Sequence, residues 1–139
     1  MFERLRFNWK AQTAHGLHSP FVYDLYVSVI NPIYQQSNVN LVEKLIHGVG
    51  SHLKLAKGKM HVIDLSRIQE IELEAIESLF ENTDNVIICL NPHANAQTYL
   101  KWQRFYQNKL VIHSIELFEM GIISLNPTAP KQHFWLKKS

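Results

Sequence analysis

Residues 60–106, MHVIDLSRIQEIELEAIESLFENTDNVIICLNPHANAQTYLKWQRFY, alternate short apolar runs with longer amphipathic ones. The runs at 60–65 and 85–91 have the length and β-branched content of strands, whereas 68–80 and 94–106 carry apolar residues at helical spacing. This strand, helix, strand, helix order predicts a parallel pair. The two strands should be neighbours, because a connection through one helix normally returns the chain beside its start.

The remainder of the C-terminal half has no helical segment between its apolar runs. Three further strand candidates follow at 110–117, 121–125 and 133–138, and the first two are joined by a short connection at 118–120. A direct strand-to-strand connection adds an antiparallel strand to the sheet. The expected fold class is therefore α/β, with a small mixed sheet of four or five strands and flanking helices.

The segment 68–80 has two faces of different character. Glu70, Glu74, Glu77 and Glu81 recur at helical spacing and predict a solvated face. The opposite face is expected to reach the core through Ile71, Ala75, Ile76, Leu79 and Phe80.

The N-terminal part predicts two helices that lie against the sheet. Residues 19–30 begin with Ser19 as a capping residue and Pro20 at the first helical position, and Asn31 with Pro32 should end this helix. A second helical pattern spans 39–55. Its glycines, Gly48 and Gly50, lie within or near the end of the helical pattern, so they predict close packing or a helix end and not a phosphate loop.

Composition indicates a single domain over residues 1–139, with an arm and helices at 1–56 and an α/β core at 57–139. The content of 46% hydrophobic residues is sufficient for a core without disulfides or metal. The single cysteine, Cys89, lies in an apolar run and predicts a buried thiol in a reducing, cytoplasmic protein. No apolar stretch is long enough for a membrane span or a signal peptide.

The net charge of +2 does not predict a nucleic-acid partner, but the charges are unevenly placed. Residues 64–84 hold seven acidic residues and one basic residue, a charge of −6, so the rest carries +8. This asymmetry could steer an acidic ligand or bring two chains together head to tail, although a solvated acidic helix face is the simpler explanation.

Two blocks resemble class I S-adenosylmethionine-dependent methyltransferases, in particular bacterial O-methyltransferase-like proteins that open with an HSPFVYDL helix. They are HGLHSPFVYDLYVSVI at 15–30 and the long block from Val86 to Lys138, which begins VIICLNPH. The resemblance covers about half of the chain. It implies a Rossmann-like fold, here its C-terminal half, and S-adenosylmethionine as the cofactor of the complete enzymes.

The segment between the two blocks is shorter than the resemblance requires. A methyltransferase of this class has a glycine-rich loop after its first strand and an acidic residue after the next, which together hold the cofactor. No glycine follows the strand at 60–65. This strand matches the family's fourth strand, with 85–91 as the fifth, or else the first strand followed by a deletion. Both placements predict a domain without a cofactor site.

The residues after the strand at 85–91 give the candidate site. The resemblance implies an acidic pair followed by a histidine here, but the chain has Leu90, Asn91 and His93. Leucine cannot bind a cation or take a proton, and asparagine carries no charge. His93 is a candidate base or, more simply, a surface residue at a helix start. Asp64 ends its strand and is a candidate carboxylate, or a cap for the following helix.

The remaining candidate residues give weaker predictions of a metal site or a binding surface. His15 and His18 are three apart, but no third ligand is evident, so no metal site is expected. The aromatic and basic N-terminus could contact RNA, an acidic lipid surface or a neighbouring subunit through Phe2, Arg4, Arg6, Phe7, Trp9 and Lys10.

Two functions follow as hypotheses. The first is a shortened methyltransferase-like domain without catalytic activity or bound cofactor, which acts through self-association or a related full-length partner. The second is an S-adenosylmethionine-dependent methyltransferase completed by a partner chain. If the first three strands are missing, the strand at 60–65 has an open edge, which predicts a homodimer, with the arm 1–18 as a second contact.

Overall fold

The computed structural model of the chain describes residues 4, 7, 11, 17, 19–36, 39–56, 58–127 and 129–138. It divides into two compact units, one of Met1–Lys57 with Trp135–Ser139 and one of Gly58–Phe134, and each is described by itself. His15, His18 and most of the arm 1–18, with the contacts predicted for the arm, lie outside the described residues. Among the described helices none is both long and apolar enough to cross a membrane.

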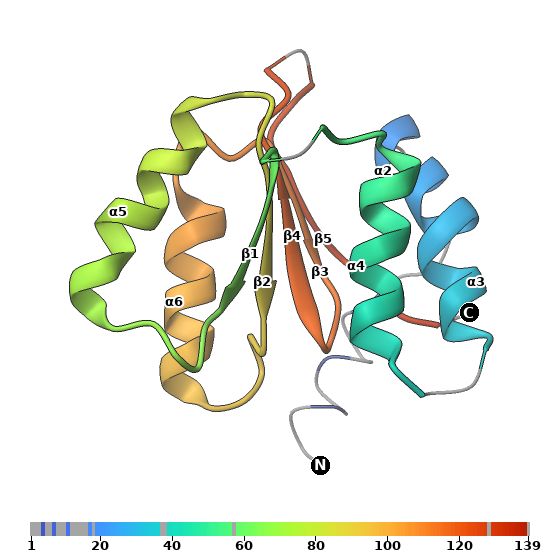
Figure 1. The fold of residues 1–139 in the computed structure, drawn as a ribbon, viewed down its shortest axis with the longest axis horizontal. Helices are drawn as coiled ribbons and strands as arrows, with labels where there is room; N and C mark the ends of the chain where they lie inside the picture. The colour runs from blue at the N-terminus through green and yellow to red at the C-terminus, as the bar shows by residue number, and fades with distance from the viewer. Residues whose placement is uncertain are drawn as a thin grey trace. The chain divides into compact units, whose positions relative to one another are not determined.

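The first unit holds the helices α2 (Pro20–Leu25), α3 (Asn31–Tyr34) and α4 (Leu41–His52) (Figure 1). The predicted helix start is confirmed: Pro20 is the first helical residue, and the Val22 backbone N–H donates to Ser19 Oγ at 3.4 Å. The helix at 41–52 begins and ends two to three residues inside the predicted range of 39–55.

The prediction that Asn31 and Pro32 end the first helix is wrong. A π-helical turn, Tyr26–Ile30, continues α2 directly into α3, and the Asn31 N–H donates to the carbonyl of Tyr26. Proline in a regular helix lacks one donor and clashes with the carbonyl four residues earlier. The wider π turn before Pro32 makes room for the ring, so the chain remains helical to Tyr34.

Gly48 is a packing glycine, as predicted. A Cβ atom at this position would lie 2.8 Å from Val29 Cγ1 and 2.9 Å from Ile33 Cδ1. Glycine therefore allows α4 to approach the preceding helical segment closely. Tyr26 ties the same unit to the C-terminal residues, since its hydroxyl donates to the carbonyl of Lys137 at 2.5 Å.

The sheet has five strands in the order β1-β2-β4-β3-β5. They are β1 (Met60–Asp64), β2 (Val86–Leu90), β3 (His113–Glu116), β4 (Met120–Ser124) and β5 (Gln132–Trp135). β1 and β2 are parallel neighbours, with Met60 opposite Val86, and β4 lies antiparallel to both β2 and β3. The predicted α/β class with a mixed sheet is confirmed, as is the pairing of the two middle strands.

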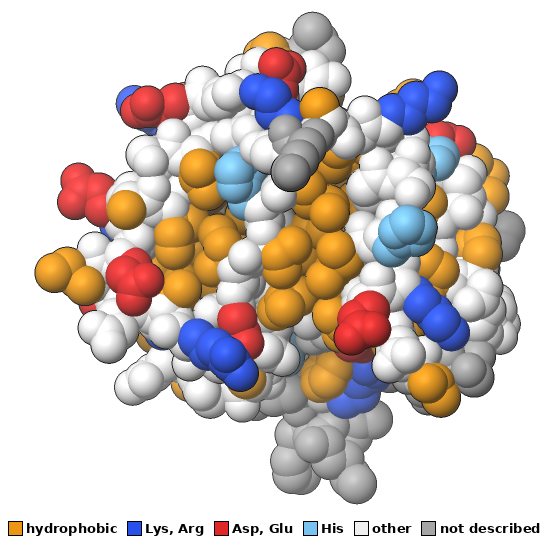
Figure 2. Space-filling model, in the orientation of Figure 1, with side chains coloured by type: hydrophobic (Ala, Val, Ile, Leu, Met, Phe, Trp, Pro, Cys, Tyr) orange, Lys and Arg blue, Asp and Glu red, His pale blue; other side chains and the backbone are white. Residues whose placement is uncertain are grey.

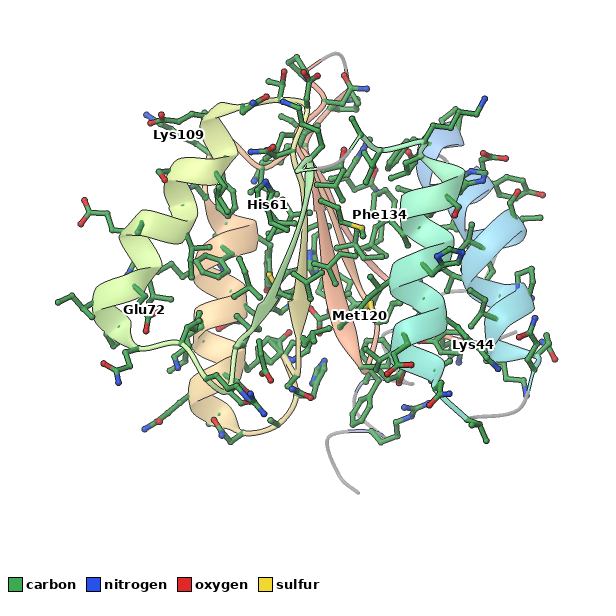
Figure 3. The ribbon with its side chains drawn as sticks, viewed as in Figure 1. Lys44, His61, Glu72, Lys109, Met120 and Phe134 are labelled. Carbon is green, nitrogen blue, oxygen red and sulfur yellow. The ribbon has the colours of Figure 1, made fainter. Side chains whose placement is uncertain are left out.

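One face of the sheet is covered by the helical segment around α5 (Leu73–Glu77) and by α6 (Ala96–Gln107), which lie side by side in Figure 1. The core of this unit contains Trp102 and Phe105 from α6, both fully buried. Phe80 meets Phe105 edge to face at 5.8 Å. Figure 3 shows His61 on this side of β1, where its Nε2 lies 3.3 Å from Asn85 Oδ1.

The segment at 68–80 is helical, but it is not one regular helix. Only α5 is α-helical, and 3₁₀ turns at Glu70–Glu72 and Ser78–Glu81 flank it. Ile71, predicted to face the core, is 85% exposed, and Leu73 is buried in its place. The 3₁₀ turn has three residues per turn, which shifts the inward face by comparison with the predicted 3.6-residue period.

Candidate functional site

Asp64 and Asn91 meet at the carboxyl ends of the parallel strands β1 and β2. The Asn91 amide nitrogen donates to Asp64 Oδ1 at 2.9 Å, and Ser66 donates to the same oxygen through its backbone N–H at 3.0 Å and its hydroxyl at 2.6 Å. Burial would raise the pKa of Asp64, but the hydrogen bonds from Ser66 and Asn91 and the charge of Arg67 lower it overall. Asp64 is therefore a charged carboxylate with oriented partners.

Asp64 does not cap the following helix, which was the simpler interpretation from sequence. Gln69 is the capping residue there, and Glu72 completes the capping box with a bond from the Gln69 N–H at 3.2 Å. Asp64 instead closes the tight turn after its own strand.

Asn91 has a backbone requirement that explains its presence after β2. Its φ is 62°, in the left-handed region that asparagine tolerates better than most residues. We expect Asn91→Ala to lower the free energy of unfolding by about 1 kcal/mol more than Asn91→Gly, since both remove the amide but only alanine is strained. Urea unfolding of the two variants measures this difference. An alanine variant as stable as the glycine variant would contradict it.

His93 is neither a lone histidine nor a surface residue, which corrects the interpretation from sequence. Its side chain is 6% exposed, and its Nε2 lies 2.8 Å from Glu116 Oε2. The ring stacks on Phe118 with centroids 5.1 Å apart and meets Tyr99 edge to face. The oriented partner that a general base needs is thus present.

Glu116, at the end of β3, is the centre of a buried polar cluster that also contains Tyr99, Trp102 and His133. Its Oε1 accepts from Trp102 Nε1 at 2.8 Å, from the Tyr99 hydroxyl at 3.3 Å and from His133 Nε2 at 2.9 Å, whereas His93 bonds to Oε2. Burial would raise the pKa of Glu116, but the hydrogen bonds from His133, His93 and Trp102 outweigh it and lower the pKa to about 2.

The protons in this cluster follow from the carboxylate, which can only accept. Both histidines must therefore carry their proton on Nε2. His133 Nδ1, 2.5 Å from Ser114 Oγ, then accepts from the serine hydroxyl when the imidazole is neutral. Tyr106 stacks on the His133 ring at 3.8 Å and holds its plane. Two consecutive hydrogen bonds therefore connect Ser114 to His133 and His133 to Glu116.

Ser114, His133 and Glu116 are the residue types of a nucleophilic catalytic triad, but a substrate cannot reach them. Ser114 is 2% exposed, and Glu116 is 1% exposed. Three of the four donors bond to Oε1 and the fourth bonds to Oε2, so both carboxylate oxygens are engaged within the unit. The arrangement therefore orients two histidines inside the unit, and burial keeps a substrate away from the carboxylate and from Ser114.

The sequence analysis did not identify Glu116, Ser114 or His133. A charged residue within an otherwise apolar strand was the available signal, since Glu is rarely buried unless it is paired. The partners of Glu116 come from the β2–α6 turn, α6 and β5, up to 23 residues away in sequence. Their meeting depends on strand order, which spacing alone does not reveal.

Within the parts of the chain that the structure describes, no group of three histidine, cysteine, aspartate or glutamate residues is placed to hold a metal ion. His93 and Asp64 belong to different arrangements: His93 reaches Glu116, and Asp64 holds the Asn91 amide.

The edge of the sheet at β1 is a second feature of interest. Of the described strands, β2 alone pairs with β1, which places β1 at the end of the strand order. Val62, at its middle, is 45% exposed. Ile63, Ile68, Ile76 and Leu79 are partly buried around the neighbouring core, and Figure 2 shows hydrophobic side chains gathered at the surface beside this strand. An apolar strand edge of this kind favours association.

Comparison with known proteins yields no match to any family model, to any curated protein or to any solved structure.

Proposed function

We propose that the chain is a methyltransferase-like association domain, which acts by pairing with itself or with a related full-length protein and does not transfer a methyl group by itself. The observation that carries the proposal is the edge strand β1, with its exposed Val62 and only one neighbour among the described strands. Unpaired backbone groups beside apolar side chains make such an edge a site for another chain.

The turn after β1 lacks the features of a nucleotide-binding turn, which supports a domain without S-adenosylmethionine. A nucleotide-binding turn directs backbone N–H groups toward the ligand and needs glycine for close approach. Here the N–H of Ser66 donates to Asp64 Oδ1, and the exposed side chain of Arg67 follows, with its Nε 3.6 Å from Asp64 Oδ2. The turn satisfies its own amide, which supports a domain without cofactor.

The closed cluster around Glu116 supports the same proposal. His93, a candidate base from the sequence, donates to a buried carboxylate that also accepts from other donors. A histidine in this position contributes to packing and polar satisfaction within the unit.

A methyltransferase completed by a partner chain is the second candidate. Asp64 favours it, because a charged carboxylate at the carboxyl end of a parallel strand has the position of a functional group in open α/β sheets. In this case the partner would supply the cofactor-binding strands at the edge beside β1.

Calorimetric titration and light scattering test the proposal. We expect no heat of binding with S-adenosylmethionine or S-adenosylhomocysteine up to millimolar concentration, since the backbone N–H groups of Ser66 and Arg67 in the turn after β1 already bond within the turn. We expect a dimer at micromolar protein concentration. Micromolar affinity for either compound would support the enzyme instead, and a monomer would contradict self-association.

A further inference from the structure

The backbone of β1 has a fixed alternation of inward and outward groups. The Lys59 carbonyl accepts from the Val86 N–H, and the Leu65 N–H donates to the Leu90 carbonyl, so these odd-numbered residues face β2. Backbone groups in a strand point to opposite sides at successive residues. The N–H and C=O groups of Met60, Val62 and Asp64 therefore point to the open edge.

We propose that a second copy of the chain pairs with this edge antiparallel, around a two-fold axis through Val62. Val62 then lies opposite Val62 of the other copy, and Met60 lies opposite Asp64. This proposal rests on the self-association proposed above and specifies its register. Each outward residue meets an outward residue of the other copy, as hydrogen-bonded antiparallel pairs require.

Three other registers are disfavoured by properties of the strand. A shift by one residue would place outward groups opposite groups already bonded to β2. A shift that placed Asp64 opposite its own copy would bring two carboxylates together. A shift in the other direction would require the paired segment to continue beyond Met60 to Gly58, whose φ of 85° is not that of an extended strand.

The Val62 register also gives most of the outward backbone groups of the strand a hydrogen-bond partner. The Val62 groups bond to each other across the axis, and each Asp64 N–H meets a Met60 carbonyl. The Asp64 carbonyl already accepts from the Arg67 N–H at 3.0 Å and so marks the end of the paired segment. The two exposed valine side chains meet on the same face of the joined sheet and exclude water from these bonds.

A second copy suits this edge because the pairing is self-complementary. A two-fold axis joins the same surface on both chains and closes the assembly at a dimer. Association driven by the charge asymmetry, from −6 at 64–84 to +8 elsewhere, would instead join different surfaces head to tail. Salt distinguishes the two modes, because screening weakens charge-driven association and leaves backbone and apolar pairing in place.

Disulfide trapping tests the register. Hydrogen-bonded antiparallel partners have Cα atoms about 5.5 Å apart, within the range that a disulfide spans. With oxidised glutathione as the oxidant, Val62→Cys should form a covalent dimer. Met60→Cys and Asp64→Cys should each stay uncrosslinked alone, since the two copies of either residue lie roughly 14 Å apart, but a mixture of the two variants should crosslink.

The native cysteine does not interfere. Cys89 is fully buried, and burial raises the pKa of its thiol, so the thiolate that attacks a disulfide does not form in the folded chain. Leu100→Cys is the matched control, because Leu100 is also an exposed apolar residue but lies on α6. Equal crosslinking of Leu100→Cys and Val62→Cys would indicate random collision and overturn the proposal.

A second variant tests the same contact without a covalent crosslink. Val62→Lys places two like charges opposite each other at the axis, and we expect the dimer dissociation constant to rise at least about tenfold, with Leu100→Lys unchanged. Light scattering at about 0.05 and 0.5 M salt, with circular dichroism to check the fold, measures this change.

The outcomes separate this inference from the proposed function. A dimer that persists in Val62→Lys, without Val62→Cys crosslinking, would overturn the register and leave self-association standing. A wild-type monomer would overturn both. A dimer that dissociates at the higher salt concentration would favour head-to-tail association and contradict the edge pairing.

Discussion

Glu116→Ala is expected to lower the free energy of unfolding by about 3–5 kcal/mol, the cost of removing one partner from a buried charged network. The substitution leaves Trp102 Nε1, His93 Nε2 and His133 Nε2 without the carboxylate that now accepts from them. Chemical denaturation followed by tryptophan fluorescence measures the change. Glu81→Ala is the control, because Glu81 is exposed, and its effect should stay within about 0.5 kcal/mol.

The charge of Glu116 should also be visible in the pH dependence of stability. Its pKa in the folded chain, about 2, lies below the ordinary value of 4.5. The ionised form is therefore favoured by folding, so this contribution is complete above pH 4.5 and is lost as the pH falls from 4.5 toward 2. This difference between the two pKa values corresponds to a contribution of about 3 kcal/mol to the free energy of unfolding at neutral pH.

Glu116→Gln isolates this contribution because it keeps the shape of the side chain and one acceptor oxygen. The stability difference between the wild-type chain and Glu116→Gln should shrink as the pH falls from about 6 to about 3. Comparing the two chains at each pH removes the titration of groups that both share. A difference that stays constant over this range would show that the charge of Glu116 does not stabilise the fold.

Gly121→Ala is expected to cost at least about 3 kcal/mol, at the upper end of overpacking substitutions. A Cβ atom at Gly121 on β4 would overlap the six-membered ring of Trp102 at Cη2, Cζ3 and Cζ2. Trp102 is fully buried and donates to Glu116, so it cannot move aside without breaking that bond. Urea unfolding measures the loss.

A double-mutant cycle distinguishes this clash from a general effect of adding a methyl group to the strand. Trp102→Phe shortens the ring system, so Gly121→Ala should cost at least about 1 kcal/mol less in that background. Gly58→Ala is the control: nothing lies within 4 Å of its Cβ position, and its φ of 85° predicts a strain of about 1 kcal/mol. Additive effects at Gly121 and Trp102 would contradict the contact.

Local patterns in the sequence were sufficient to predict most of the elements. The alternation of strands and helices over 60–106 predicted the parallel pair β1 and β2, and the direct connection at 118–120 predicted the antiparallel strand. Ser19 and Pro20 predicted a helix start. These predictions succeeded because capping, turn chemistry and hydrophobic period act between residues close together in the chain.

The predictions that were wrong concern features that the tertiary surroundings decide and that residues close together in the chain do not. Asn31 and Pro32 predicted a helix end, but a π turn accommodates the proline. Ile71 predicted a core contact, but a 3₁₀ turn points it outward. In both cases a change of helical pitch, which the surroundings select, altered the face that a residue presents.

The candidate site divides in the same way. The sequence by itself determined the α/β class and the positions of Asp64 and Asn91 at the ends of adjacent strands, because parallel strands joined through a helix end at one edge. Tertiary structure alone decided that His93 and His133 share the carboxylate of Glu116, which becomes possible when β4 inserts between β2 and β3. A buried charge needs hydrogen-bond partners, and the fold supplies them from distant parts of the sequence, so the spacing of residues in the sequence does not predict them.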